Sequence, residues 1–285
     1  MIVTLKDILR VAEARKCAIG AFNTPNMTGV KAVIEAAEQR REPVIIMHAQ
    51  VHEQMGLCKM EEIAPVMLSF ADRASVPVCV HLDHGEDLDY IKRGLDLGFT
   101  SVMYDGSALD VDLNFAHTAI AVEMAKEYGA SVEAEIGSMG ARESGASGGN
   151  DESIYTDPDI AAKFVRETGI DALACAFGTV HGVYLKEPKL DFDRLAKIKS
   201  LVDVPLVMHG GSGVSHEDYR RVIGLGIRKI NYYTYMTLAG GKAVKEALDK
   251  KSADDNIFYH DIPLISIEAM KNDVVNAIKI FSLED

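Results

Sequence analysis

Residues 18–47 read AIGAFNTPNMTGVKAVIEAAEQRREPVIIM and contain one complete strand–helix–strand pattern. Ala18–Phe22 and Val44–Met47 are short, nearly all-apolar runs, as is typical of strands buried on both faces. Val30–Gln39 has the spacing of an amphipathic helix. Two parallel strands need a crossover connection of this kind, so the segment predicts a parallel α/β unit.

The same unit recurs along the chain. Helical patterns such as Glu61–Ala74 and Asp112–Tyr128 separate six further apolar runs: Val78–Leu82, Thr100–Tyr104, Ser131–Ile136, Ala172–Phe177, Pro205–Met208 and Arg228–Ile230. Eight such repeats predict a single (β/α)8 TIM barrel followed by C-terminal helices, with a doubly wound open sheet as the alternative. No change in composition indicates a linker, so we expect one domain over residues 1–285.

The composition is that of a folded protein and excludes several classes of function. The chain is 48% hydrophobic and 26% charged, with a net charge of −13. This charge argues against a nucleic-acid partner and a polybasic membrane anchor, although a local pocket can still bind a phosphorylated metabolite. The N-terminus lacks the apolar core of a signal peptide, and no run of about 18 apolar residues predicts a membrane span. We expect a cytoplasmic protein whose four cysteines are reduced thiols.

Each predicted strand has a polar or ionisable side chain at or just after its carboxyl end. In chain order these are Asn23, His48, Asp83 with His84, Asp105, Glu135, His181, His209 and Asn231. Active sites of such barrels are built at the carboxyl ends of the strands. We therefore expect these side chains to share one mouth, although any one of them alone is compatible with an ordinary surface position.

Three of the histidines indicate a catalytic metal site. His84, His181 and His209 follow three different strands, and each of them directly precedes a glycine. Three protein ligands and an open position are the pattern of catalytic zinc. Asp83 is either a general acid/base or a carboxylate that orients a histidine. In an extended strand its side chain would point away from that of His84, so we expect the chain to turn there, as Gly85 would allow.

Two further segments indicate how a substrate is held. Gly210–Gly213 lies after the seventh strand and Asn231–Thr234 after the eighth, where barrels frequently bind phosphate. Residues 137–155 form a long Gly- and Ser-rich loop after the fifth strand, expected to be a mobile active-site loop. Its Glu143 and Glu152 are acid/base candidates.

These residues carry a resemblance to a known family. Over nearly its whole length the chain resembles the class II, zinc-dependent fructose-bisphosphate and tagatose-bisphosphate aldolases. Seven motifs match in the family's order: AFN (Ala21–Asn23), HLDHGE (His81–Glu86), SVMYDGS (Ser101–Ser107), VEAEIG (Val132–Gly137), GTVHG (Gly178–Gly182), HGGSG (His209–Gly213) and KIN (Lys229–Asn231).

The resemblance implies roles for individual residues. The implied zinc ligands are His84, His181 and His209, with a second or displaced metal position at Asp105 and Glu135. Asp83 matches the catalytic aspartate, and Glu143 matches the carboxylate that moves the proton at the donor carbon. The residues that match the dihydroxyacetone-phosphate site, where a monovalent cation (Na⁺ or K⁺) is also expected, are Asn23, Gly182, Gly210, Gly211, Ser212, Asn231 and Thr234. The resemblance also implies a homodimer or homotetramer.

The implied reaction is reversible cleavage of a ketose 1-phosphate or 1,6-bisphosphate to dihydroxyacetone phosphate and an aldehyde. Cleavage at C3–C4 needs an electron sink at the C2 carbonyl, which zinc bound to neutral imidazoles provides by stabilising the enediolate. Asp83 would take the proton of the C4 hydroxyl, and Glu143 would protonate the enediolate. A lysine Schiff base is the alternative sink, and Lys229 is its candidate.

Two segments depart from the family pattern. Tyr232-Tyr233-Thr234-Tyr235 replaces a usually small apolar pair and an acidic residue, so the tyrosines must repack the mouth or an interface. The segment His48–His52 lacks the usual Ser and Gly. These departures leave the exact ketose phosphate open. A zinc hydrolase on the same barrel and a metal-binding protein without catalysis are the alternative functions.

Overall fold

Nine strands form one parallel sheet in the computed structural model, which describes residues 1–137, 155–180, 182, 188–252 and 255–284. The strands are β1 (Ile2–Val3), β2 (Ile19–Asn23), β3 (Val44–Ala49), β4 (Val78–Gly85), β5 (Ser101–Tyr104), β6 (Ser131–Ile136), β7 (Ala172–Cys175), β8 (Leu206–Met208) and β9 (Ile227–Tyr232). Each of the eight predicted runs corresponds to one of the strands β2 to β9.

Pairing between β4 and β5 closes the sheet. The order β4-β3-β2-β9-β8-β7-β6-β5 is completed by hydrogen bonds from β5 back to β4, so the TIM barrel is confirmed and the open sheet is excluded. The short strand β1 was not predicted. It pairs Ile2 with Val78 at the beginning of β4, before β5 joins that strand at His81.

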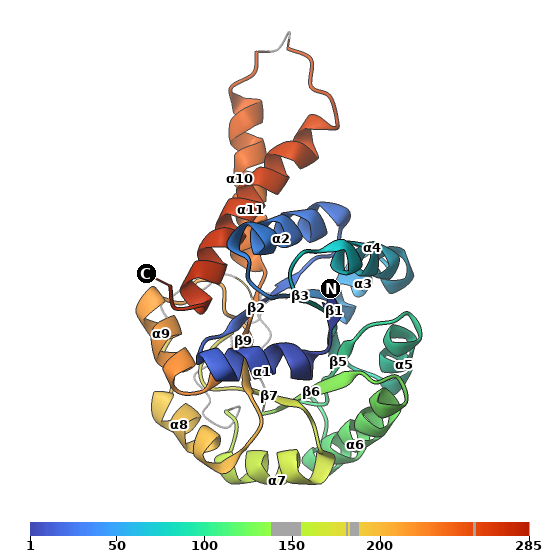
Figure 1. The fold of residues 1–285 in the computed structure, drawn as a ribbon, viewed down its shortest axis with the longest axis vertical. Helices are drawn as coiled ribbons and strands as arrows, with labels where there is room; N and C mark the ends of the chain where they lie inside the picture. Colours follow the sequence, from blue (N-terminus) through green and yellow to red (C-terminus); the bar gives the residue numbers. More distant parts are fainter. Residues whose placement is uncertain (138–154, 181, 183–187, 253–254, 285) are drawn as a thin grey trace.

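Helices surround the strands (Figure 1). They are α1 (Leu5–Arg15), α2 (Met27–Arg40), α3 (Gln50–Gln54), α4 (Met60–Arg73), α5 (Leu88–Asp96), α6 (Val111–Glu127), α7 (Pro158–Thr168), α8 (Phe192–Leu201), α9 (His216–Gly224), α10 (Thr234–Asp249) and α11 (Asp261–Phe281). Many begin with a short polar residue whose side chain accepts a backbone N–H of the first turn, which satisfies a donor left open at a helix end. These caps are Thr4, Asn26, Asp87, Asp157, Asp191 and Ser215.

Helix α1 closes one end of the barrel. Its apolar face joins inward-facing strand residues such as Ile45 and Cys79 in one buried cluster. The backbone N–H of Lys6 donates to the Ser131 hydroxyl at 3.0 Å, at the first residue of β6, so α1 lies at the amino ends of the strands. A site that admits substrate must therefore open at the carboxyl ends.

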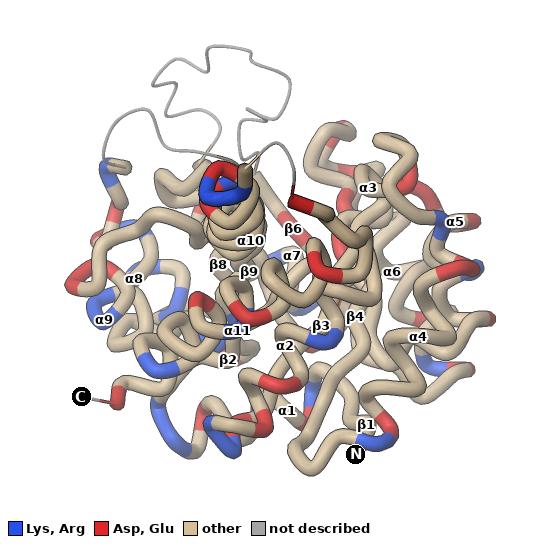
Figure 2. The backbone as a smooth tube through the Cα atoms, turned by 90° about the horizontal axis from the view of Figure 1, so that it is seen from above, with Lys and Arg blue, Asp and Glu red and all other residues tan. Residues whose placement is uncertain are grey.

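Helices α10 and α11 project from the barrel as an arm (Figure 1). Exposed apolar side chains gather toward its end, including Phe258, Tyr259 and Leu264. Charged residues of both signs are interspersed over the outer helices (Figure 2). Within the described part of the chain, no helix combines the length and the apolar character that crossing a membrane requires.

Candidate active site

A cavity of about 590 Å³ opens at the carboxyl ends of the strands. Most of the predicted site residues line it: Asn23, Asp83, His84, Asp105, Glu135, Gly182, Gly210, Gly211, Ser212, Asn231 and Thr234. His209 lies beside this cavity and is fully buried. His181 and Glu143 lie outside the described residues, so their predicted roles stay predictions.

A bulge at the end of β4 lets Asp83 and His84 face the same cavity. The register between β4 and β5 shifts between Leu82 and Gly85, and His84 has a left-handed backbone with φ of 47°. This conformation is uncommon for a residue other than glycine and breaks the alternation of an extended strand. The expected turn is thus present, and His84 itself adopts the left-handed conformation that makes it. Gly85 provides space, because a Cβ there would lie 2.6 Å from Ile91 Cδ1.

Two asparagine side chains hold the Asp83 carboxylate. Asn23 Nδ2 donates to Oδ2 at 2.9 Å, and Asn231 Nδ2 donates to Oδ1 at 3.1 Å. Burial alone would raise the pKa of Asp83, but the positive charges of His84 and Lys229 hold it below its usual value. Asp83 is therefore an oriented, ionised carboxylate at the floor of the cavity, as a general base requires.

Nitrogen and oxygen donors gather next to Asp83. Ligand atoms of Asp83, His84 and His209 lie within 4.8 Å of one another, and so do those of His84, Asp105 and Glu135. The Nδ1 atom of His84 is 2.6 Å from Asp105 Oδ2, so Asp105 orients this imidazole. Burial opposes the charge of His84, but Asp83 and Asp105 raise its pKa to about 10. The carboxylates thus favour a positive charge at this position.

A buried ion-pair network lies beneath His209. Glu133 Oε1 is 2.8 Å from His209 Nε2, and Lys229 Nζ is 2.8 Å from Glu133 Oε2. None of these three side chains is exposed to solvent. The sequence reasoning assigned no role to Glu133, and the only signal was a second glutamate two positions before Glu135 in β6. Because Lys229 is enclosed here and does not line the cavity, it is not placed to form a Schiff base with a substrate.

The network fixes which nitrogen of His209 faces the cavity. Burial raises the pKa of Glu133, but Lys229 and His209 reverse this and keep the carboxylate ionised. An ionised carboxylate only accepts, so His209 donates through Nε2 and keeps Nδ1 as an acceptor. That Nδ1 lies 3.5 Å from Glu135 Oε2. Because both the imidazole nitrogen and the carboxylate oxygen are acceptors, this pair is suited to binding one cation between them. Zinc is commonly bound by imidazole and carboxylate ligands of this kind.

The loops after β8 and β9 meet at the other side of the cavity. Gly210 has φ of 59°, and a Cβ there would lie 2.3 Å from the Val180 carbonyl oxygen. The Ser212 hydroxyl accepts the backbone N–H of Tyr233 at 3.2 Å, which joins the two loops. Helix α10 begins at Thr234 in the cavity wall, so the positive end of its dipole is close to the predicted phosphate position.

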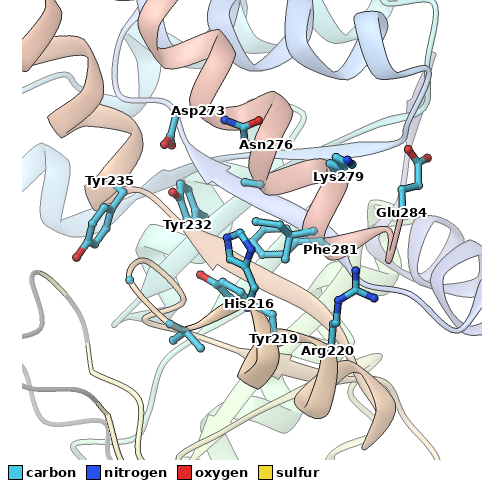
Figure 3. A pocket seen from close by; sticks show the side chains of 14 residues that line it. His216, Tyr219, Arg220, Tyr232, Tyr235, Asp273, Asn276, Lys279, Phe281 and Glu284 are labelled. Atoms are coloured by element: carbon cyan, nitrogen blue, oxygen red, sulfur yellow. The ribbon is translucent and has the colours of Figure 1, made fainter.

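The tyrosines after β9 have separate surroundings. Tyr233 lines the cavity together with His52, and their ring centroids are 5.0 Å apart. Tyr232 packs against the rings of Phe22 and Phe281. With Tyr235, Tyr232 borders a second cavity of about 610 Å³ between β9, α9 and α11 (Figure 3). Tyr232 also lines the candidate-site cavity, as do Tyr233 and, from the His48–His52 segment, Ala49, Val51 and His52. Both departures from the expected pattern therefore change the wall of the site.

The chain was compared with known proteins. A family model described as "Fructose-bisphosphate aldolase class-II" matches residues 3–285. The crystal structure of the YdjI aldolase from Escherichia coli K12 is 36% identical over 99% of this chain and 97% of that one, with a TM-score of 0.86. A putative fructose-1,6-biphosphate aldolase from Coccidioides immitis is 29% identical, covering 97% and 95%, with a TM-score of 0.84. A fructose-bisphosphate aldolase from Campylobacter jejuni, 22% identical, covering 98% and 95%, has the same fold with a TM-score of 0.80.

Proposed function

Because the chain belongs to the class II fructose-bisphosphate aldolase family, we propose that it reversibly cleaves a ketose 1-phosphate or ketose 1,6-bisphosphate to dihydroxyacetone phosphate and an aldehyde. Membership supports metal-dependent aldolase activity, while the substrate is the finer part of the proposal. The observation that carries the proposal is that three features share one cavity: the oriented Asp83 carboxylate, the histidine and carboxylate side chains suited to a metal ion, and the glycine-rich loops suited to a phosphate.

The donor cluster fits zinc, the metal on which this family generally depends. His84 and His209 offer imidazole nitrogens, and the predicted third histidine is His181. Glu135 offers a carboxylate for a second position, while Asp105 is occupied in orienting His84. Bound zinc would supply a Lewis acid that draws electron density from the substrate carbonyl. A monovalent cation near the phosphate stays a prediction.

Asp83 supplies the base for bond cleavage. Its two oxygens are fixed by Asn23 and Asn231, so the carboxylate has one orientation toward the cavity. In the cleavage direction it takes the proton of the C4 hydroxyl as the C3–C4 bond breaks, and in the condensation direction it returns that proton to the aldehyde oxygen. Glu143 remains the predicted carrier of the proton at C3.

The glycine loops hold the phosphate of the donor half. Positive φ at Gly210 and Gly213 lets successive backbone amides converge, and the start of α10 adds the favourable end of a helix dipole. A phosphate fixed there places C2 and C3 toward the donor cluster after β4, β6 and β8.

The test is release of dihydroxyacetone phosphate from a panel of ketose 1-phosphates and ketose 1,6-bisphosphates, detected with a coupled reductase. Release that stops with a chelator and returns with zinc is expected. Hydrolysis without carbon–carbon cleavage would favour the zinc-hydrolase alternative, and no release by zinc-loaded protein would contradict the proposal.

Location and assembly belong to the same proposal. The predicted homodimer or homotetramer draws support from the exposed apolar side chains on the α10–α11 arm, which a second copy of the chain would cover. A cytoplasmic location follows the sequence expectation. Both remain predictions.

A further inference from the structure

His52 forms a part of the cavity wall that the mechanism above does not use. It belongs to α3, directly after β3, and is 4% exposed. Its ring lies 5.0 Å from that of Tyr233 and 6.3 Å from that of His48, which is completely buried. Nδ1 of His52 and both ring nitrogens of His48 have no hydrogen-bond partner among the described residues.

The place of His52 relative to the other groups indicates which part of a substrate it meets. The phosphate loops follow β8 and β9, and the metal donors follow β4, β5, β6 and β8. The end of β3 carries neither set of groups, so it is available to the part of a ketose beyond the C4 hydroxyl, next to Asp83. His52 lies after β3, and the order of strands puts β3 beside β4, which carries Asp83.

The two histidines are uncharged at neutral pH. Burial lowers the pKa of His48 to about 4 and also lowers the pKa of His52. A neutral imidazole carries one donor and one acceptor, as a hydroxyl group does. Of the two, His52 lines the cavity, so this residue is matched to a hydroxyl group of a substrate, and leaving its buried ring nitrogen unpaired would cost free energy.

The charge of the cavity wall disfavours a second phosphate. It includes the carboxylates Asp83, Glu86, Asp105 and Glu135, and none of the described residues that line it is lysine or arginine. One phosphate has a place at the glycine loops, and zinc would offset part of the carboxylate charge. A second dianion beyond Asp83 would be desolvated without an opposite charge from the described part of the wall, which is strongly unfavourable.

We propose that His52, packed against Tyr233, is a specificity-determining residue that selects an aldehyde half with hydroxyl groups and no phosphate. The substrates are then ketose 1-phosphates and not ketose 1,6-bisphosphates. This inference rests on the proposed aldolase function.

The first test is condensation of dihydroxyacetone phosphate with unphosphorylated glyceraldehyde, erythrose and arabinose, compared with glyceraldehyde 3-phosphate. Exchange of the C3 hydrogen of dihydroxyacetone phosphate with D2O, without any aldehyde, is measured in parallel. We expect kcat/KM for the best unphosphorylated aldehyde to exceed that for glyceraldehyde 3-phosphate by roughly tenfold or more. Preference for glyceraldehyde 3-phosphate, or exchange without condensation of any unphosphorylated aldehyde, overturns the inference. Absence of exchange contradicts the aldolase function itself.

Substitutions at position 52 test the residue. His52→Ala is expected to lower kcat/KM for the unphosphorylated aldehyde roughly tenfold, mainly through KM. His52→Arg adds a positive charge and should shift the ratio of the two kcat/KM values toward glyceraldehyde 3-phosphate by roughly tenfold. His52→Gln keeps a donor and an acceptor and should retain the original preference. The control is His260→Ala, at an exposed position on the arm. An unchanged ratio in folded His52→Arg overturns the assignment.

Discussion

Replacing Lys229 with methionine removes one partner of an ion pair that the barrel encloses. Nζ of Lys229 lies 2.8 Å from Glu133 Oε2, and neither side chain is exposed. The substitution leaves the Glu133 carboxylate buried beside the neutral rings of His209, at 2.8 Å, and His81, at 3.7 Å, without a full positive charge next to it among the described residues. Breaking a buried pair by removing one partner typically costs about 3–5 kcal/mol, because the remaining charge is uncompensated. We expect a loss of this size in the free energy of unfolding.

The assay is urea unfolding of metal-free protein at pH 7. The double variant Lys229→Met/Glu133→Gln removes both charges and should recover a large part of the lost stability. Lys242→Met is the matched surface control, since its pair with Glu246 is exposed, and it should change stability by under about 0.5 kcal/mol. A loss below about 1 kcal/mol for Lys229→Met, or no recovery in the double variant, would refute the electrostatic account of this network.

Further predictions concern the base, the phosphate loop and pH. Asp83→Asn should keep bound zinc and lower the cleavage rate about 100-fold or more, measured by coupled assay; near-normal cleavage would reassign the base. Gly210→Ala should raise KM for phosphorylated ketoses, because its Cβ would meet the Val180 carbonyl at 2.3 Å; an unchanged KM would count against the phosphate loop. Burial holds the pKa of His48 in the folded protein at about 4, below the usual 6.5 of an exposed histidine, so the unfolded chain binds more protons between these values. Wild-type stability should therefore be full above pH 6.5 and fall toward pH 4, and His48→Gln should remove about 3 kcal/mol of that fall; parallel profiles by urea titration would exclude a neutral buried His48.

The barrel could be predicted because each strand is an isolated apolar run. Runs such as Val44–Met47 are buried on both faces and need no partner to be identified. Strand β1 is different. Two residues, Ile2 and Val3, carry no periodicity, and they pair with the beginning of β4, before the residues of that strand that pair with β5. The position of α1 across the amino ends of the strands likewise depends on packing against the barrel, and the amino-acid pattern of the helix does not reveal it.

Most of the candidate site could be predicted because barrel topology gathers strand ends. Asn23, Asp105 and Asn231 lie at the cavity for this reason. A turn between Asp83 and His84 was expected, but its form could not be predicted, since left-handed backbone at a histidine has no clear sequence signal.

Contacts between distant segments were the least predictable part. The pairing of Glu133 with Lys229 joins β6 to β9 across the barrel interior. The contact of His52 with Tyr233 joins segments after β3 and β9. Both segments departed from the expected family pattern, and only the three-dimensional structure shows that the two departures meet in one wall.

Deuterium exchange at C3 of dihydroxyacetone phosphate, followed by proton NMR in D2O without an aldehyde, tests the central claim most directly. It isolates proton removal at the donor carbon from the identity of the aldehyde. The zinc-loaded protein should exchange the hydrogen, lose this activity with a chelator, regain it with zinc, and lack it in His209→Ala. Exchange that persists after chelation or in His209→Ala would contradict a metal-dependent aldolase site at these residues.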